Sequence, residues 1–369
     1  MRKVKVAVIG THGIPAKYGG FETLAEVLCL HLQQRVRFTV YCNAGLYAEK
    51  PKYYNGARLR YIPLNASGFQ GVLYDVLTFI HALFTANIVL FLSPVGSGSI
   101  LPLKVLFGKK VIVNHGGLNE WERPKLSWFA KKWARLNHFI AGRFADVNVV
   151  DNQAYQRSLK QAFGVDSVVI KYGADHVRGV SRNDARFSTR YSFLPEKYAI
   201  SVSRAQVDNN LHMVLEAFRN FGSFPLVLVS NWEVSEYGRK LKEEFADCGN
   251  VFLVDAIYNT DELNYLRSNA CCYVHSHSFC GTAPSLIEAM CLGKAVLAFD
   301  VVTNRETTKG NAFFFGTSSE LLQLLRSLRE VDFVENGKEM LHLAEKEYRW
   351  SVIAEAYFDL FNRKLTSGN

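Results

Sequence analysis

The stretch of sequence that decides the fold is His275-Ser-His-Ser-Phe-Cys-Gly-Thr-Ala-Pro-Ser-Leu-Ile-Glu-Ala-Met-Cys-Leu-Gly293. It predicts a strand over Cys272–His275, a turn at Gly281-Thr282 and a helix that begins near Pro284. The backbone N–H groups at such a helix start bind anions, and the carboxylate of Glu288, one turn in, can accept hydrogen bonds from sugar hydroxyls. This one loop therefore has the chemistry to hold both halves of a nucleotide-sugar.

Similar strands recur along the 369 residues, a length that fits two domains. Near-continuous apolar strands separated by helical patterns indicate parallel sheets covered on both faces. The predicted fold class is therefore α/β, in two similar halves with a ligand cleft between them at the carboxyl ends of the strands. Strands are expected at Lys3–Ile9, Arg37–Tyr41, Leu59–Ile62, Ile88–Leu92, Val111–Asn114, Val147–Val150 and Val168–Ile170, and then at Tyr198–Ser203, Leu226–Ser230, Val251–Val254, Cys272–His275, Ala295–Phe299 and Ala312–Phe315.

The domain boundary is expected in the polar segment Asp175–Pro195, which is rich in arginine and has weak periodicity. We therefore predict a first domain over residues 1–175, a second over residues 176–350 and a C-terminal helix over residues 351–369. Strong helical patterning over Glu335–Leu365 supports that last element. Other helices are expected at Phe21–Leu32, Leu126–Arg143, Leu211–Phe221 and Ser318–Arg329.

The formal net charge of +9 favours anionic partners, namely nucleotides, nucleic acid or acidic lipid headgroups. No motif that reads RNA or DNA is present, so no nucleic-acid partner is expected. The seven cysteines include no C-x-x-C and are interpreted as buried thiols. Met1–Gly10 carries charges within its apolar run and is expected to be a strand rather than a signal peptide. Asp75, His81 and Asn87 interrupt Gly71–Leu92, which predicts a helix followed by a buried strand rather than a membrane span.

The first predicted strand ends in a loop, Gly10-Thr-His-Gly-Ile-Pro-Ala-Lys-Tyr-Gly-Gly-Phe-Glu22. Its glycine spacing is not G-x-G-x-x-G, which disfavours a dinucleotide-dependent dehydrogenase. Gly19-Gly20 suits close approach of the backbone to a bulky ligand, although a tight turn with positive φ would require the same residues. Lys17 and Glu22 are candidate acceptor-binding residues; as an alternative, both are solvated residues at a helix entrance.

Arg204 follows the first predicted strand of the second domain, and its planar fork of donors suits a phosphate. The alternative is a surface arginine paired with Asp208. Asn209 is a candidate donor contact, but it or Asn210 could instead cap the following helix.

Two further motifs have alternatives. Ser285-Leu-Ile-Glu288 matches the S-x-x-E pattern of a capping box, in which Glu288 would bond backbone N–H groups. His275 and His277 lie two apart at a strand end, as a metal pair would, but no third ligand is evident. Ordinary polar roles are therefore expected, and no metal is predicted.

In combination, these motifs resemble the retaining glycosyltransferases with two Rossmann-like domains, the GT-B architecture of family four. The shared features are the strand with its Gly-Gly loop, Ser-Arg204 after a strand, and Gly-Thr-x-Pro-Ser-Leu-x-Glu288-Ala-Met. Residues 13–23, Tyr172-Gly-Ala-Asp175 and Asn304-Arg305-Glu306 resemble in particular the bacterial rhamnosyltransferase-like branch. The resemblance covers almost the whole chain and implies a hexosyltransferase-type enzyme of capsule, O-antigen or exopolysaccharide synthesis that uses a nucleotide diphosphate sugar.

The resemblance implies roles for individual residues. Arg204 would clamp the donor diphosphate and Glu288 would hold its ribose. His115 would lie near the transferred sugar, although it could equally be a loop residue at a strand end. The catalytic candidates are His115 and Arg204; the further donor-binding candidates are Gly19, Gly20, Asn209, Ala256, Tyr258, Gly281, Thr282, Ser285 and Glu288, and the acceptor-binding candidates are Lys17, Glu22, Trp121 and Arg123. The last helix would cross back onto the first domain.

The chain departs from the family pattern at two positions. Many family members carry a glutamate eight residues before the position of Glu288, where this chain has Cys280. Many also carry a lysine five residues after the clamping arginine, where this chain has Asn209. Both departures put the identity of the donor in doubt more than the class of enzyme.

The resemblance also implies a mechanism. The departing nucleoside diphosphate would be stabilised by Arg204 and by the helix start at Gly281–Ser285, without a metal or a cofactor. The leaving phosphate would draw the acceptor proton on the same face of the sugar, and no protein nucleophile is evident. The alternative is a nucleotide-sugar epimerase or hydrolase on the same scaffold.

The segment Lys125–Arg143 contains basic residues and no acid, with aromatic side chains interleaved at helical spacing. This pattern predicts an interfacial helix on an anionic membrane surface. The alternative is an ordinary amphipathic helix that packs Trp128, Leu136 and Phe139 into the core. Membrane contact would fit a polyprenyl-diphosphate-linked glycan acceptor, and the resemblance implies a cytoplasmic protein at the inner face of the cell membrane.

Overall fold

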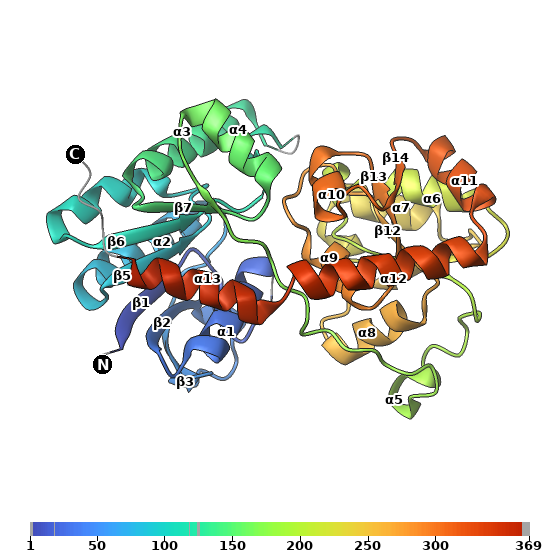
Figure 1. Cartoon of the computed structure of the whole chain (residues 1–369), viewed down its shortest axis with the longest axis horizontal. Coiled ribbons are helices and arrows are strands. Elements are labelled where there is room, and N and C mark those ends of the chain that lie inside the picture. The colour runs from blue at the N-terminus through green and yellow to red at the C-terminus, as the bar shows by residue number, and fades with distance from the viewer. Residues whose placement is uncertain (1–2, 18, 118, 124–125, 364–369) are drawn as a thin grey trace. The chain divides into compact units, whose positions relative to one another are not determined.

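The computed structural model describes residues 3–17, 19–117, 119–123 and 126–363. These residues form two compact units: unit 1 comes from Met1–Lys171 with Trp350–Asn369, and unit 2 is Tyr172–Arg349. The chain therefore leaves unit 1 after residue 171 and returns to it for the last helix (Figure 1).

Unit 1 contains a sheet whose described strands have the order β3-β4-β2-β1-β5-β6-β7-β8. All neighbouring strands are parallel except β3 and β4, which form a short antiparallel pair that the sequence patterns do not predict. The strands are β1 (Val4–Ile9), β2 (Val36–Asn43), β3 (Tyr53–Tyr54), β4 (Ala57–Ile62), β5 (Ile88–Leu92), β6 (Lys110–Asn114), β7 (Val147–Val150) and β8 (Val168–Val169).

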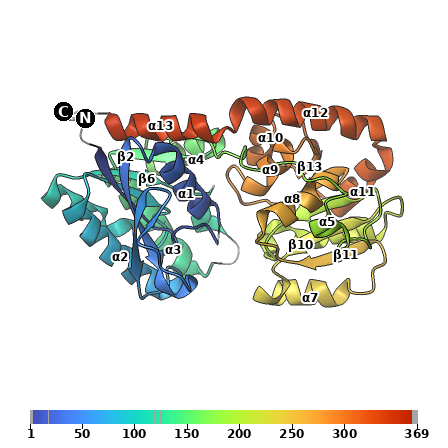
Figure 2. The same ribbon diagram turned by 90° about the horizontal axis from the view of Figure 1, so that it is seen from below.

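Helices cover both faces of this sheet (Figure 2). On one face α1 (Gly20–Leu32) packs against α13 (Trp350–Asn362), and Asn114 Nδ2 of β6 donates to the Tyr357 hydroxyl of α13 at 2.8 Å. On the other face lie α2 (Gly68–Thr85), the 3₁₀ segment η2 (Gly98–Phe107) and α3 (Trp128–Phe144). Further short segments are η1 (Ala44–Leu46), η3 (Glu120–Glu122) and α4 (Gln153–Phe163), of which α4 contacts β7 and β8.

Unit 2 contains a second, fully parallel sheet with the order β11-β10-β9-β12-β13-β14. Its strands are β9 (Ala199–Val202), β10 (Leu226–Ser230), β11 (Val251–Asp255), β12 (Cys272–His275), β13 (Ala295–Phe299) and β14 (Phe313–Phe315). Its helices are α5 (Ala185–Ser188), η4 (Val207–Asn209), α6 (Leu211–Arg219), η5 (Trp232–Val234), α7 (Glu236–Glu244), α8 (Thr260–Asn269), α9 (Pro284–Cys291), α10 (Val302–Thr307), α11 (Ser318–Ser327) and α12 (Glu330–Glu347).

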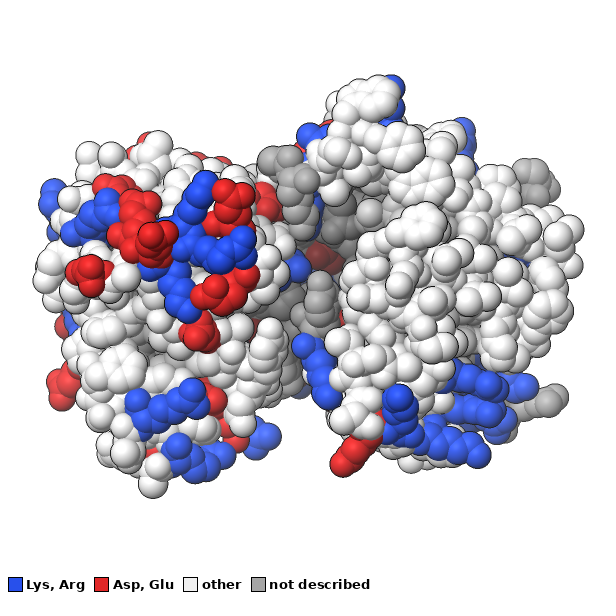
Figure 3. Space-filling model, turned by 180° about the vertical axis from the view of Figure 1, so that it is seen from behind, with Lys and Arg blue, Asp and Glu red and all other residues white. Residues whose placement is uncertain are grey.

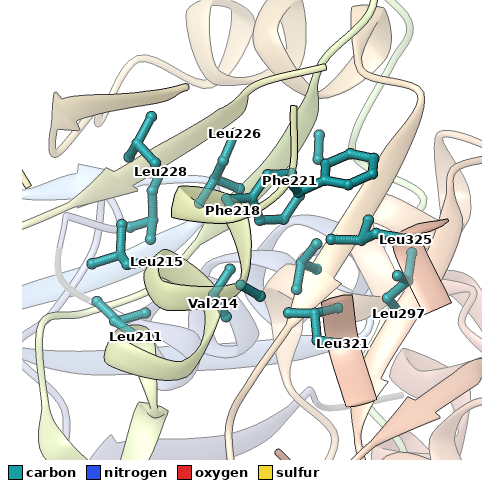
Figure 4. Close-up of a cluster of buried hydrophobic side chains, with 14 of the residues drawn as sticks. Leu211, Val214, Leu215, Phe218, Phe221, Leu226, Leu228, Leu297, Leu321 and Leu325 are labelled. Atoms are coloured by element: carbon teal, nitrogen blue, oxygen red, sulfur yellow. The ribbon is translucent and has the colours of Figure 1, made fainter. Parts of the chain in front are cut away.

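The core of unit 2 follows from the helical period of α6. Leu211, Val214, Leu215 and Phe218 recur at spacings of three and four, so they lie on one stripe of the helix. Figure 4 shows this stripe facing side chains of β10 and α11, and all of these side chains are buried. The parallel sheets with helices on both faces confirm the predicted α/β fold class.

The patterning over Glu335–Leu365 corresponds to two helices rather than one. α12 ends at Glu347 and α13 begins at Trp350. Between them the carbonyl of Tyr348 accepts a hydrogen bond from Ala174 N at 2.9 Å, and its hydroxyl donates to the carbonyl of Thr307 at 2.7 Å. These contacts from distant segments end the helix where no Gly or Pro marks an end. Residues 364–369 of the predicted helix lie outside the described residues. None of the described helices has the length and apolar composition needed to cross a membrane.

Candidate active site

The candidate site of unit 2 is built from two loops, residues 203–210 after β9 and residues 276–283 after β12. β9 and β12 are parallel neighbours, so their carboxyl ends meet at one edge of the sheet. Hydrogen bonds join the loops: Ser203 Oγ lies 2.7 Å from His277 Nε2, and the Ser276 hydroxyl donates to the carbonyl of Asn209 at 2.5 Å. The structure therefore brings the loop of Arg204 and the loop of Gly281-Thr282 together, which no local sequence pattern predicts.

The side chain of Arg204 is exposed, as a phosphate-binding group requires. No ion pair joins it to Asp208 in the described part of the chain, and Asp208 is buried, so the alternative of a paired surface arginine is wrong. The Asn209 side chain is also buried, and its amide donates to the carbonyl of Arg204 at 2.8 Å. Neither Asn209 nor Asn210 caps α6 through its side chain. Asn209 thus fixes the backbone beside Arg204, and its direct contact with a donor stays a prediction.

Helix α9 begins as the sequence predicts, with Pro284 in its first turn. Its N-cap is Ala283, and no side chain caps it, so the capping box of Ser285 and Glu288 is not formed. Gly281 and Thr282 are buried in the preceding turn. The first N–H groups of a helix have no acceptor within the helix, so this start attracts an anion.

Glu288 forms the charged centre of the site. Its Oε2 lies 2.6 Å from Nη2 of Arg267 on α8, and its Oε1 lies 3.4 Å from Nε2 of His176. Burial raises the pKa of Glu288, but the charges and hydrogen bonds of Arg267 and His176 outweigh burial and hold the pKa below its ordinary value. The carboxylate therefore stays ionised and can accept hydrogen bonds. Sequence reasoning missed Arg267 and His176, because both reach Glu288 from distant segments.

A cluster of possible metal ligands lies in the loop after β12. Ring nitrogens of His275 and His277 and the Cys280 sulfur lie within 4.8 Å of one another. His275 is buried, its Nδ1 has no hydrogen-bond partner among the described residues, and burial lowers its pKa to about 3. Neutral imidazoles with a thiolate form a ligand set that zinc accepts. Cys280 is thus a candidate third ligand that sequence spacing did not reveal, and the absence of a metal stays a prediction.

The donor-binding candidates Ala256 and Tyr258 lie in the loop after β11. Tyr258 is 78% exposed and Ala256 is half-buried. The Trp232 indole donates to the carbonyl of Val254 at 2.9 Å, which fixes the start of this loop. An exposed aromatic ring beside a fixed backbone can stack on a base.

In unit 1, Glu22 organises the loop after β1. Its Oε1 accepts hydrogen bonds from the Thr11 hydroxyl and from the backbone N–H of His12, both at 2.8 Å. Burial raises the pKa of Glu22, but the hydrogen bonds from His12 and Thr11 outweigh burial and lower it. Glu22 is buried, so the alternative of a solvated residue at a helix entrance is wrong. Acceptor binding by Glu22 stays a prediction.

The glycines of this loop divide into two kinds. Gly10 and Gly13 have φ of 76° and 109°, and a Cβ at either would collide with neighbouring atoms, so the tight-turn interpretation holds there. Gly19 has an extended backbone that any residue adopts, and Gly20 begins α1. The Lys17 side chain is exposed and lies 5.0 Å from the centre of the Tyr47 ring. Gly19, Gly20 and Lys17 stay candidates for ligand contact.

Two other candidates of unit 1 are buried. The His115 ring has Nε2 at 2.8 Å from Asn148 Oδ1 and Nδ1 at 3.1 Å from His138 Nδ1, and burial lowers its pKa to about 4. Trp121 packs in a cluster with the rings of His138 and Phe163. Neither side chain has appreciable exposed surface, so contact with a sugar or an acceptor stays a prediction for both. Arg123, two residues after Trp121 in the sequence, is half-buried.

Asp75 is a candidate that sequence reasoning missed. Its Oδ2 accepts a hydrogen bond from the Ser97 hydroxyl at 2.6 Å, and burial raises its pKa to about 7. A carboxyl group that titrates near neutral pH is typical of functional sites and also of strained structural positions. The raised pKa of Asp75 follows from its burial beneath the start of η2, a position that the sequence does not reveal.

Comparisons with known proteins give a match in each half of the chain. Residues 186–338 match the family model described as glycosyl transferases group 1, and residues 2–175 match a domain of unknown function, DUF1972. None of the curated proteins matches the chain significantly.

Solved structures show the same fold at low identity. Sucrose-phosphate synthase from Thermosynechococcus elongatus aligns with a TM-score of 0.78 and 17% identity over 97% of this chain and 98% of that chain. The Anabaena protein HepE, in complex with UDP-glucose, aligns with a TM-score of 0.73 and 13% identity over 97% and 99% of the two chains. A glycosyltransferase from Rickettsia africae aligns with a TM-score of 0.73 and 14% identity over the full length of both chains.

The two α/β units define the GT-B architecture. With the group 1 domain in unit 2, the chain is a nucleotide-sugar-dependent glycosyltransferase.

Proposed function

We propose that the chain transfers a hexose, with rhamnose as the candidate, from a nucleoside diphosphate sugar to a polyprenyl-diphosphate-linked glycan. The transfer would retain the anomeric configuration and serve the synthesis of a bacterial capsule, O-antigen or exopolysaccharide. The motifs at residues 13–23, 172–175 and 304–306, which resemble the rhamnosyltransferase-like branch, support this assignment.

One observation carries the proposal: the loop of Arg204 and the loop before α9 are hydrogen-bonded to each other at adjacent strand ends. An exposed guanidinium and the start of a helix therefore belong to one edge of the sheet, and an ionised carboxylate, Glu288, follows one turn into the helix. Cations and N–H groups suit the diphosphate, and the carboxylate suits the ribose hydroxyls.

In the proposed mechanism, the site stabilises the charge that develops on the departing nucleoside diphosphate. Donors held in place before the reaction need little reorganisation, which makes such stabilisation the largest usual contribution to catalysis. The Arg204 guanidinium and the first N–H groups of α9 would supply these donors. The departing phosphate would accept the proton of the attacking hydroxyl, and this proton transfer needs no protein base.

The base of the donor is the least constrained part of the proposal. HepE is solved with UDP and with UDP-glucose, which makes UDP-sugars the first donors to test. Cys280 and Asn209 stand where many family members have a glutamate and a lysine, so the sugar and the phosphate have different partners here. We therefore include dTDP- and GDP-sugars in the test.

The test is a transfer assay with dTDP-rhamnose, UDP-glucose and GDP-mannose on a synthetic polyprenyl-diphosphate-linked glycan. We expect one donor to be consumed only when acceptor is present, and NMR of the product to show the anomeric configuration of the donor. Arg204→Ala should lower turnover by roughly 10²–10³-fold, the usual effect of removing one such donor. Acceptor-independent hydrolysis or epimerisation would assign the chain to the alternative enzyme class, and an inverted product would contradict retention.

A further inference from the structure

Helix α2 of unit 1 is apolar on two opposite sides. One side packs on the sheet through residues such as Tyr74, Phe79 and Leu83. The other carries a stripe of exposed apolar residues at spacings of three and four: Phe69, Leu73, Leu77, Ile80 and Phe84. A helix that is apolar all round is normally buried on all sides. This stripe of α2 is therefore an apolar surface that the described part of the chain leaves uncovered.

The exposed stripe continues onto η2 and α3. The rings of Phe84 and Phe107 meet at 4.9 Å, which joins α2 to η2, and Leu106 of η2 is 78% exposed. The N-terminal turn of α3 adds Trp128 and Phe129, which are 69% and 71% exposed. We call these three segments, Gly68–Thr85, Gly98–Phe107 and Trp128–Phe144, the apolar face. Figure 3 shows a broad area of unit 1 without Lys, Arg, Asp or Glu side chains on the side that carries α2.

The exposure of these side chains also corrects an alternative from the sequence. If α3 were an ordinary amphipathic helix, Trp128, Leu136 and Phe139 would pack into the core. All three are exposed, and α3 instead buries small and polar residues such as Ala134 and Asn137. Lys125, the first residue of the predicted basic segment, lies outside the described residues.

The size of the apolar face exceeds what a soluble surface normally shows. Phe69 is 83% exposed and Phe84 is 69% exposed. With Leu106, Trp128 and Phe129 they present on the order of 700 Å² of apolar surface, since a large aromatic side chain has about 150–250 Å². The largest apolar patch of a typical monomer is about 300–600 Å² and usually marks an interaction site.

The charges of the apolar face have one sign. α3 carries Lys131, Lys132, Arg135 and Arg143 and no acidic residue. The Lys132 ammonium lies 3.9 Å from the centre of the Trp128 ring, so aromatic and cationic groups are interleaved. The only acid of α2 is Asp75, whose carboxylate is hydrogen-bonded to Ser97. The apolar face therefore presents hydrocarbon together with cations and offers no anion to a partner.

We propose that the apolar face docks on an anionic lipid bilayer, with the exposed stripe of α2 in the acyl boundary and the cations of α3 at the headgroups. A bilayer supplies hydrocarbon and anionic groups in this arrangement. A second copy of the chain would instead bring the same lysines and arginines against these, and like charges repel. This proposal names the membrane as a partner of the proposed glycosyltransferase. It rests on the proposed function because that function assigns a lipid-linked acceptor, which a bilayer would hold.

Vesicle flotation tests the proposal on the full chain. Wild type should float with vesicles that contain one third phosphatidylglycerol and bind pure phosphatidylcholine vesicles at least tenfold more weakly. Phe69→Ser with Phe84→Ser should weaken binding to anionic vesicles by roughly tenfold or more, because two large apolar side chains are lost. Lys131→Glu with Lys132→Glu should weaken it by a similar factor and remove the preference for anionic lipid. Val234→Ser, at an equally exposed valine of unit 2, is the matched control and should float like wild type.

Three outcomes would overturn the proposal: no flotation with anionic vesicles, equal losses in the Val234→Ser control, or a concentration-dependent dimer that the α2 substitutions dissolve. Circular dichroism of each variant keeps a folding defect from being read as lost binding. Nucleotide binding, followed in the same samples by the thermal shift with UDP, dTDP and GDP, separates the two proposals. Flotation without any nucleotide binding would support membrane docking by the apolar face and contradict the proposed function.

Discussion

The Arg267–Glu288 pair is the residue-scale contact on which the proposed ribose site depends most. Arg267 is 3% exposed, and its Nη2 lies 2.6 Å from Glu288 Oε2. A charge at such a position is stable only with its partner, because desolvation costs several kcal/mol for each ion. The pair therefore keeps Glu288 ionised and fixes the direction of its carboxylate. His176 contacts the other carboxylate oxygen, and the Glu288 side chain is still 16% exposed.

Arg267→Met tests this dependence. Removing the guanidinium leaves the Glu288 carboxylate uncompensated, so we expect the free energy of unfolding of unit 2 to fall by about 3–5 kcal/mol. The double variant Arg267→Met/Glu288→Gln should recover most of that loss, because no buried charge remains. Urea unfolding of wild type, both single variants and the double variant gives the coupling energy. Additive effects of the two substitutions would contradict a direct pair.

Among the elements, α2 combines the exposed stripe with a buried carboxyl group. Asp75 lies on its inner side, and burial raises the pKa of Asp75 to about 7. The pKa of an unfolded aspartate is about 3.9. Between these two values the folded state binds more protons than the unfolded state, so the free energy of unfolding falls as the pH rises from about 4 to about 7.

Asp75→Asn should remove this pH dependence, because the amide fills the same space without a charge. We expect the variant to be more stable than wild type at pH 8 by on the order of 2–4 kcal/mol and to match it at pH 4. Urea unfolding at pH 4, 6 and 8 measures this difference. Asp247→Asn, at an exposed aspartate of unit 2, is the control and should leave the profile unchanged. An Asp75→Asn profile parallel to that of wild type would mean that Asp75 is solvated.

Most elements could be predicted from the sequence because their periodicity is local. The expected helix Phe21–Leu32 is α1 (Gly20–Leu32), and the expected strand Leu226–Ser230 is β10 with the same bounds. The break between α12 and α13 could not be predicted, because hydrogen bonds from Ala174 and to Thr307 end the helix. The outer stripe of α2 was hidden for another reason: apolar residues on all sides indicate burial and do not reveal which side lacks a partner.

At the scale of the whole molecule, the kind of chemistry could be predicted and the partners of each residue could not. Arg204, Gly281 and Glu288 follow strand ends or open a helix, positions that local patterns reveal. The pairing of the two loops, the ion pair with Arg267 and the approach of the Cys280 thiol to His275 and His277 depend on tertiary structure. The sequence alone leaves these contacts open. His115 and Trp121 fit motif positions, yet burial separates both from solvent in unit 1.

The central claim is that Arg204 and the start of α9 bind the diphosphate of a nucleotide-sugar. Calorimetric titration of wild type, Arg204→Ala and the matched control Arg326→Ala with UDP, dTDP and GDP tests it most directly. We predict that wild type binds one of these nucleotides, that Arg204→Ala binds it about 10–100-fold more weakly, the usual effect of losing a charged hydrogen bond, and that Arg326→Ala binds like wild type. Equal affinities of wild type and Arg204→Ala, or no binding of any nucleotide by wild type, would contradict the account.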